Sequence, residues 1–185
     1  MKKLLVFAFV AVFSLPMLKA QESMFNLGDK VVSLGIGFGT TLYSGGYYSR
    51  GFPPLSISYE QAIKDDILEK GVIGVGGYLG YTSYKWDYLG WGYKYSNIIF
   101  GAGGSFHYPL VDKLDTYISI LLGYRISTSS EYGTSIPGYD YDTSSGGLVF
   151  SSFVGARYYF TETIAAFAQV GYGISYLTIG VSIRF

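Results

Sequence analysis

The sequence predicts an all-β fold, specifically an eight-stranded antiparallel up-and-down transmembrane β-barrel. Apolar side chains alternate with small or polar ones over eight segments, and this period of two is that of a β-strand. Gly and Tyr are abundant, at 26 and 20 of 185 residues, whereas charged residues make up only 14%. The connections between segments alternate between long and short, as expected when one end of a barrel carries loops and the other tight turns.

The composition excludes several other classes of protein. So much Gly disfavours a helical domain, because each helical Gly costs roughly 0.8 to 1 kcal/mol relative to Ala. The chain has no Cys, so it has no disulfide framework, thiol nucleophile or Cys-ligated zinc. Its formal net charge of zero argues against a nucleic-acid partner.

Residues 1–20 predict a cleaved secretory signal peptide. Lys2 and Lys3 precede an apolar stretch from Leu4 to Leu15, and small Ala20 precedes the expected cleavage point. A retained anchor is disfavoured because the apolar stretch falls well short of the roughly 20 residues that span a bilayer. The remainder, residues 21–185, is expected to be one outer-membrane barrel domain. Its net charge is −3, because three of the 13 basic residues and none of the 13 acidic ones lie in residues 1–20.

The eight expected strands are defined by their alternation. In the first, Leu34 and Ile36 fall on one parity, with Gly35 and Gly37 on the other. Glycines at every second position give one clean strand face and no helical face. The segments are 31–42, 55–60, 73–81, 97–107, 117–125, 150–159, 168–171 and 177–185.

The charged side chains indicate which face is inside. Within the segments, Glu60, Arg125, Arg157 and Arg184 all lie on the small, polar parity, together with Gly, Ser and Tyr. This composition fits the crowded lumen of a narrow barrel, whereas a solvent-facing surface would be rich in Lys and Glu. The apolar parity is then expected to face lipid, where an Arg would cost roughly 2 to 4 kcal/mol at the midplane. A soluble, lipocalin-like barrel is the alternative, although so few charges suit a wet exterior poorly.

The connections predict two different ends of the barrel. Residues 43–54, 84–95 and 128–147 form long links expected outside the cell, whereas 63–70, 109–114 and 160–163 form shorter links expected in the periplasm. The fourth outer link, residues 173–176, is exceptionally tight.

The C-terminal segment carries a resemblance to a known family. Apolar residues occupy every second position up to a terminal aromatic residue, namely Leu177, Ile179, Val181, Ile183 and Phe185. With GARYYF at 155–160 and FAQVGYG at 167–173, the chain resembles the eight-stranded outer-membrane β-barrel domain family, similar in architecture to the OmpX and OmpA transmembrane barrels. The resemblance implies a Gram-negative outer-membrane location, contact with outer-membrane lipid, and a C-terminal strand read by the barrel assembly machinery.

The inward polar side chains form the first candidate site, a structural network in the lumen. Its members are Glu60, His107, Arg125, Arg157, Gln169 and Arg184. We expect Glu60 to be the counter-ion of Arg157 or Arg184, since side chains fill the interior of an eight-stranded barrel. The alternative is a small porin-like channel with anion preference, because three arginines would face one acid.

Ser105 and His107 suggest a third, less favoured function, a lipid-modifying hydrolase. The two residues share a face, but a Ser nucleophile needs a base within about 2.6 to 3.2 Å and a third group that orients the base. Ser105 and His107 are about 6.6 Å apart along the strand, so this contact is not assured. A packed, hydrogen-bonded histidine is the simpler interpretation.

Aromatic residues crowd the outer links. The second link contains Tyr84, Trp86, Tyr88, Trp91, Tyr93 and Tyr95. The first contains Tyr43, Tyr47, Tyr48 and Phe52, and the third Tyr132, Tyr139 and Tyr141. These residues either form the interfacial aromatic belt and pack the loops together, or present a ligand surface, because Tyr gives a large contact area at low entropy cost.

These observations predict a non-enzymatic surface protein of structural or adhesive role, with a glycan or protein ligand at its outer loops. No cofactor, metal or nucleic acid is implied. Asp140 and Asp142 could hold Ca²⁺ only weakly, because that ion wants about six to eight oxygen ligands.

Overall fold

The computed structural model describes residues 23–40, 42, 48–88, 91–132 and 143–185. These residues contain no helix, and so none long and apolar enough to cross a membrane. They form eight strands: β1 (Lys30–Phe38), β2 (Tyr48–Ile67), β3 (Gly71–Tyr88), β4 (Trp91–Val111), β5 (Leu114–Tyr132), β6 (Thr143–Tyr159), β7 (Ile164–Tyr172) and β8 (Leu177–Arg184).

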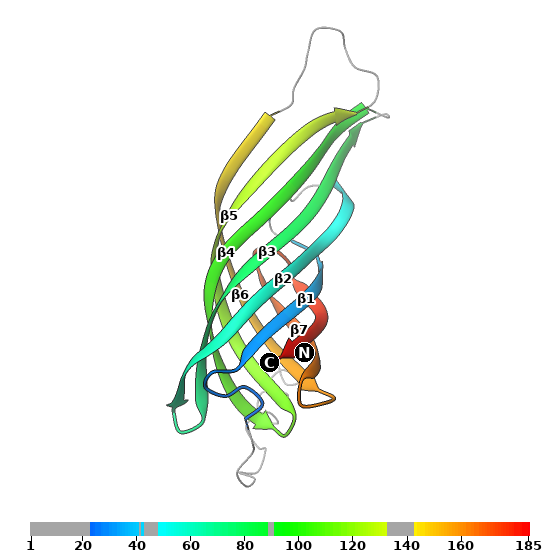
Figure 1. Ribbon diagram of the computed structural model, residues 1–185. Helices are drawn as coiled ribbons and strands as arrows, with labels where there is room; N and C mark the ends of the chain where they lie inside the picture. The colour runs from blue at the N-terminus through cyan, green and yellow to red at the C-terminus, as the bar shows by residue number, and fades with distance from the viewer. Residues whose placement is uncertain (1–22, 41, 43–47, 89–90, 133–142) are drawn as a thin grey trace, which may run out of the picture.

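The strands close into one antiparallel barrel in sequence order (Figure 1). Closure is made by β1 and β8, which pair from Val31 opposite Arg184 to Phe38 opposite Leu177. The predicted fold class is therefore confirmed. We call the end where β1 begins and β8 ends the turn end, because residues 68–70, 112–113 and 160–163 connect strands there. The opposite end is the loop end.

The two faces of the sheet separate as the alternation predicted. Outward side chains are apolar and exposed, as for Leu34 at 53%, Leu122 at 61% and Val154 at 58%. The inward side chains at neighbouring positions are buried, for example Ser33 and Leu121. This inside-out distribution is that of a barrel whose exterior faces hydrocarbon.

Glycines allow the sheet to coil tightly around the lumen. Gly76 of β3 lies opposite Gly103 of β4. A Cβ at Gly76 would lie 1.9 Å from the carbonyl oxygen of Tyr59, and one at Gly103 would lie 2.2 Å from that of Ile120. Any larger residue would therefore push neighbouring strands apart at these two positions.

The barrel wall is much taller on one side than on the other. Strands β2 to β6 have 17 to 21 residues, whereas β1, β7 and β8 have only 8 or 9. The longer strands continue beyond the closed barrel at the loop end, as Figure 1 shows. Pairing of β1 with β2 stops at Leu55, and pairing of β7 with β6 stops at Ser152. We call the projecting part of β2 to β6 the wall.

The prediction of long outer loops is wrong, because most of these residues belong to the strands of the wall. Residues 84–95, expected to be a loop, belong almost entirely to β3 and β4, which stay paired up to Tyr88 opposite Trp91. The first link also shortens, because β2 already begins at Tyr48, and the third shortens because β5 continues to Tyr132 and β6 begins at Thr143. The predicted signal peptide and Tyr43, Tyr47, Tyr139, Asp140, Tyr141 and Asp142 lie outside the described residues.

Candidate functional site

Four ionisable side chains from four strands meet inside the barrel near its turn end. They are Glu60 of β2, His107 of β4, Asp115 of β5 and Arg157 of β6. The register explains the meeting, because Asp115 lies directly opposite Arg157 and next to the pair formed by His107 and Tyr117. We call these four residues the lumen cluster.

Arg157 forms a salt bridge with each acid of the cluster. Its Nη1 donates to Oδ2 of Asp115 at 3.1 Å, and its Nη2 donates to Oε2 of Glu60. The guanidinium carbon also lies 4.7 Å from the centre of the Tyr117 ring. Arg157 is only 5% exposed, so its charge depends on these partners for stabilisation.

His107 lies between the same two acids and is 1% exposed. Its Nδ1 is 2.7 Å from Oδ1 of Asp115, and its Nε2 is 3.0 Å from Oε1 of Glu60. Nε2 also lies 2.9 Å from Oγ of Ser105, whose hydroxyl donates to the same Glu60 oxygen. Because a carboxylate oxygen faces each ring nitrogen, the full set of hydrogen bonds forms when both nitrogens donate.

The order Ser105, His107, Asp115 superficially matches that of a nucleophile, a base and an orienting acid. A general base must accept the proton of the serine hydroxyl, however, and here that hydroxyl already donates to Glu60. With Nε2 donating to Glu60 as well, His107 has no free lone pair for Ser105. The arrangement therefore suits a cluster of two cations and two anions better than a hydrolase.

Asp115 is the functional residue that the sequence reasoning missed. The prediction of three arginines facing one acid is wrong, because Asp115 is a second lumen acid and Arg184 has its own acid. Asp115 shares the parity of Tyr117 and Arg125 on β5, and this alternation could have revealed it. The expected start of that strand at Tyr117 excluded it.

Arg184 lies at the rim of the turn end and is not part of the lumen cluster. Its Nη1 lies 3.4 Å from Oδ2 of Asp29 and donates to the carbonyl oxygen of Met24 at 2.6 Å. Its guanidinium carbon is 5.2 Å from the Tyr159 ring centre. Of the two predicted counter-ion pairs, the structure shows the one between Glu60 and Arg157.

Residues 23–29 fold across the turn end of the barrel. Phe25 is fully buried, and its ring centre lies 4.2 Å from that of His107. It also packs with Val31, Ala62 and Val72. Backbone hydrogen bonds from Gly28 to Ala62 and from Ala62 to Asp29 fix this segment against β2. We call residues 23–29 the plug.

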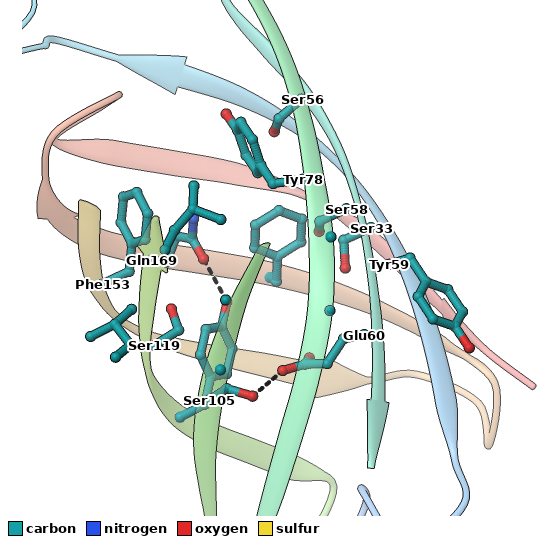
Figure 2. A pocket seen from close by; sticks show the side chains of 18 of the residues that line it. Ser33, Ser56, Ser58, Tyr59, Glu60, Tyr78, Ser105, Ser119, Phe153 and Gln169 are labelled. Carbon is teal, nitrogen blue, oxygen red and sulfur yellow. Dashed lines mark hydrogen bonds between the residues drawn. The ribbon is translucent and has the colours of Figure 1, made fainter. Parts of the chain in front are cut away.

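A polar cavity of about 100 Å³ borders the lumen cluster on the side away from the plug (Figure 2). Ser105 and Glu60 border it, and Gln169 accepts a hydrogen bond of 2.9 Å from the hydroxyl of Tyr117. Serines of several strands complete its polar lining, namely Ser33, Ser56, Ser58 and Ser119. The cavity is large enough for several water molecules.

An apolar layer crosses the lumen beyond the cavity. Ile99, Leu121, Val149 and Ile174 form one buried cluster, against which Leu42 and Tyr78 pack. Ile174 reaches this layer because the tight link after β7 turns at Gly173, whose φ of +109° favours Gly. Arg125 follows Leu121 by four residues on β5, so it lies toward the loop end and apart from the lumen cluster. The plug and the apolar layer thus bound the cavity on opposite sides.

Comparison with solved structures identifies the fold. The N-terminal β-barrel domain of OprF from Pseudomonas aeruginosa matches with a TM-score of 0.51 and 15% identity, over 86% of this chain and 98% of that one. Ail, the attachment invasion locus protein of Yersinia pestis, matches with a TM-score of 0.55 and 14% identity, over 86% of this chain and all of that one. The chain has the fold of the OmpA/OmpX/Ail-like eight-stranded outer-membrane barrels. No family model and no curated protein sequence matches it.

Within this OmpA/OmpX/Ail-like fold, the predicted aromatic loop is a pair of strands. Tyr84 lies opposite Tyr95, and Trp86 lies opposite Tyr93. All four share the inward parity of Thr82, which is fully buried. The Trp86 and Tyr93 ring centres are 6.2 Å apart. These aromatic residues therefore line the inner face of the wall. Tyr88 lies opposite Trp91 where β3 and β4 end.

The belts of aromatic residues on the outside of the OmpA/OmpX/Ail-like barrel come from other positions. Tyr81, Phe52 and Tyr124 are exposed near the loop end, and Tyr158 and Phe160 near the turn end. The alternating residues of the C-terminal segment, Leu177, Ile179, Val181, Ile183 and Phe185, are all exposed on the outward, apolar face.

Proposed function

We propose that the chain is a non-enzymatic protein of the outer membrane, exported by the signal peptide in residues 1–20, that presents the wall outside the cell as an adhesive or structural surface. The observation that carries this proposal is the difference in strand length. Five neighbouring strands continue well beyond the three that end at the closed barrel. The apolar outer face and its two aromatic belts support insertion of the closed part in a bilayer.

The inner face of the wall supports binding of a glycan. Tyr84, Trp86, Tyr93 and Tyr95 gather there as two cross-strand pairs. Tyr84 is buried, whereas Trp86, Tyr93 and Tyr95 are half-buried, and their rings give rigid contact area for a flat ligand. Buried polar side chains, including Asn97 and Ser127, follow on the same face and support the aromatic pairs from below. Ail has been solved in complex with sucrose octasulfate, a heparin analogue, which makes sulfated glycans the first ligands to test.

A binding experiment with paired variants tests this proposal. Whole cells or purified barrels carrying Trp86→Ala and Tyr93→Ala are compared with Phe100→Ala and Tyr124→Ala, a second cross-strand aromatic pair that faces outward. We expect the first variant to lose immobilised glycan binding and the second to keep it. Equal binding by both variants would contradict glycan binding at the inner face of the wall.

The OmpA/OmpX/Ail-like barrel also carries the C-terminal alternation from Leu177 to Phe185 on its outward face. We propose that the assembly machinery reads this exposed edge before β8 closes against β1. This step gives the same five residues two successive roles, in recognition and then in lipid contact.

A further inference from the structure

The two ends of the described chain meet at the turn end of the barrel. Nη1 of Arg184 donates to the carbonyl oxygen of Met24 at 2.6 Å, and its Nη2 donates to that of Glu162 at 2.5 Å. Lys30 and Phe185 exchange two backbone hydrogen bonds, of 3.0 and 2.9 Å. Arg184 and Phe185 therefore bind the plug, the start of β1 and the β6–β7 turn.

These contacts lie beside the pairing of β1 with β8, which we call the seam. It is the one pairing in the described barrel between strands that are not consecutive in the sequence, and it extends over eight residue pairs. β8 shares only seven further pairs with β7, whereas β3 and β4 share 17. Contacts between distant parts of a chain form slowly, because loop-closure entropy must be overcome first. We therefore expect the seam to close last and to open first.

The plug contacts strands on both sides of the seam. Phe25 is fully buried, and it packs with one residue from each of β1, β2 and β3, namely Val31, Ala62 and Val72. Its ring centre lies 4.2 Å from that of His107 on β4 and 5.9 Å from the guanidinium carbon of Arg157 on β6. On the β8 side, Arg184 binds the neighbouring residue Met24. The full set of plug contacts thus exists only in the closed barrel.

We propose that the plug keeps the seam closed: it docks only after β1 and β8 have paired, and it then prevents their separation. A segment that binds only one of two states stabilises that state by its own docking free energy. The plug continues directly into β1, so its effective concentration at the docking site is high. Docking also keeps Arg184 and Phe185 from returning to the periplasm, a consequence that rests on the proposed membrane location and assembly signal.

Kinetics of the mature barrel in lipid vesicles test this order of events. Phe25→Ala is compared with Leu27→Ala, a change in the same segment at a side chain that is 55% exposed. Contacts that form after the transition state affect the unfolding rate alone. We therefore expect Phe25→Ala to unfold in urea about 100-fold faster and to fold at the unmodified rate, and Leu27→Ala to change neither rate. The fast-migrating band on unheated gels follows both reactions.

A double-mutant cycle tests whether the plug and the seam act as one unit. Loss of the Phe25 ring already frees Met24 from Arg184, so the two changes are not independent. We expect Phe25→Ala combined with Arg184→Ala to accelerate unfolding by clearly less than the product of the two single effects. Amide hydrogen exchange at Lys30 and Phe185, where the seam ends, should accelerate in Phe25→Ala and not in Leu27→Ala.

Three results would overturn this role of the plug. Slower folding of Phe25→Ala with unchanged unfolding would place docking before closure. Single effects that multiply, or unchanged exchange at the seam, would make the plug a cover of the lumen alone. Fractionation of cells tests the membrane location separately, so a barrel found in the outer membrane with any of these results contradicts the role of the plug and leaves the proposed location standing.

Discussion

Arg157 and Glu60 form a buried ion pair across the lumen, although 97 residues separate them in the sequence. The pair joins β6 to β2, which are not neighbours in the barrel. Asp115 and His107 complete the charge balance around it. The cluster therefore links strands through the lumen as well as through the sheet, and it fixes their register from inside.

Replacement of Glu60 by Gln should destabilise the barrel. The change leaves Arg157 and His107 to share the one remaining acid, Asp115, and a buried charge that loses its counter-ion costs roughly 3 to 5 kcal/mol. Urea unfolding of barrels in lipid vesicles measures the difference. The matched control is Glu162→Gln, an exposed acid in the β6–β7 turn, which should change stability little. Equal stability of both variants would show that the lumen pair contributes nothing measurable.

Replacement of Phe25 by Ala should loosen the plug. Phe25 is fully buried against His107, and truncation of a buried Phe typically costs about 3 to 5 kcal/mol. Leu27→Ala is the control, because Leu27 lies in the same segment but is 55% exposed. Hydrogen exchange at residues 23–29 should accelerate in the first variant only. If both variants exchange alike, the plug is not held by the Phe25 ring.

The barrel should show no stable single-channel conductance in planar bilayers. The plug closes the turn end, and the apolar layer of Ile99, Leu121, Val149 and Ile174 crosses the lumen. Opening both barriers, by deletion of residues 23–27 and replacement of Leu121 with Gly, should produce conductance. Discrete channels in the unmodified barrel would contradict this account of the lumen and favour the pore.

Ser105 should not behave as an activated nucleophile. Its hydroxyl donates to Glu60, and His107 has a carboxylate oxygen at each ring nitrogen. A fluorophosphonate probe should therefore leave the folded barrel unlabelled, and lipid A acylation in cells should be the same with Ser105→Ala. If the unmodified barrel is labelled and Ser105→Ala is not, this prediction is wrong and the hydrolase function is supported.

The closed part of the barrel could be predicted because its two faces lie in different environments. Lipid outside and packed side chains inside impose a strict alternation, which gave the faces correctly at Leu34, Glu60 and Arg157. The wall could not be found by the same rule. Beyond the bilayer the outward positions become polar, as at Lys85, while the inward ones become aromatic, as at Tyr84, so the alternation continues with its polarity reversed.

Two residues of the candidate site, Asp115 and Phe25, were not predicted from the sequence. Asp115 follows the charged pair Asp112 and Lys113 of an exposed turn, so it resembles another turn residue until the register places it opposite Arg157. Phe25 precedes the first strand and belongs to no periodic segment. Phe25 is buried because residues 23–29 fold across the turn end of the barrel, and this end exists only once the strands have closed.

The central claim, a folded barrel that spans the outer membrane, is tested most directly by gel migration of the outer-membrane fraction with and without boiling. The account predicts a band in that fraction that migrates faster when it is not heated, because a closed barrel resists detergent. A chain recovered only from the periplasm or the medium, with no shift on heating, would contradict it.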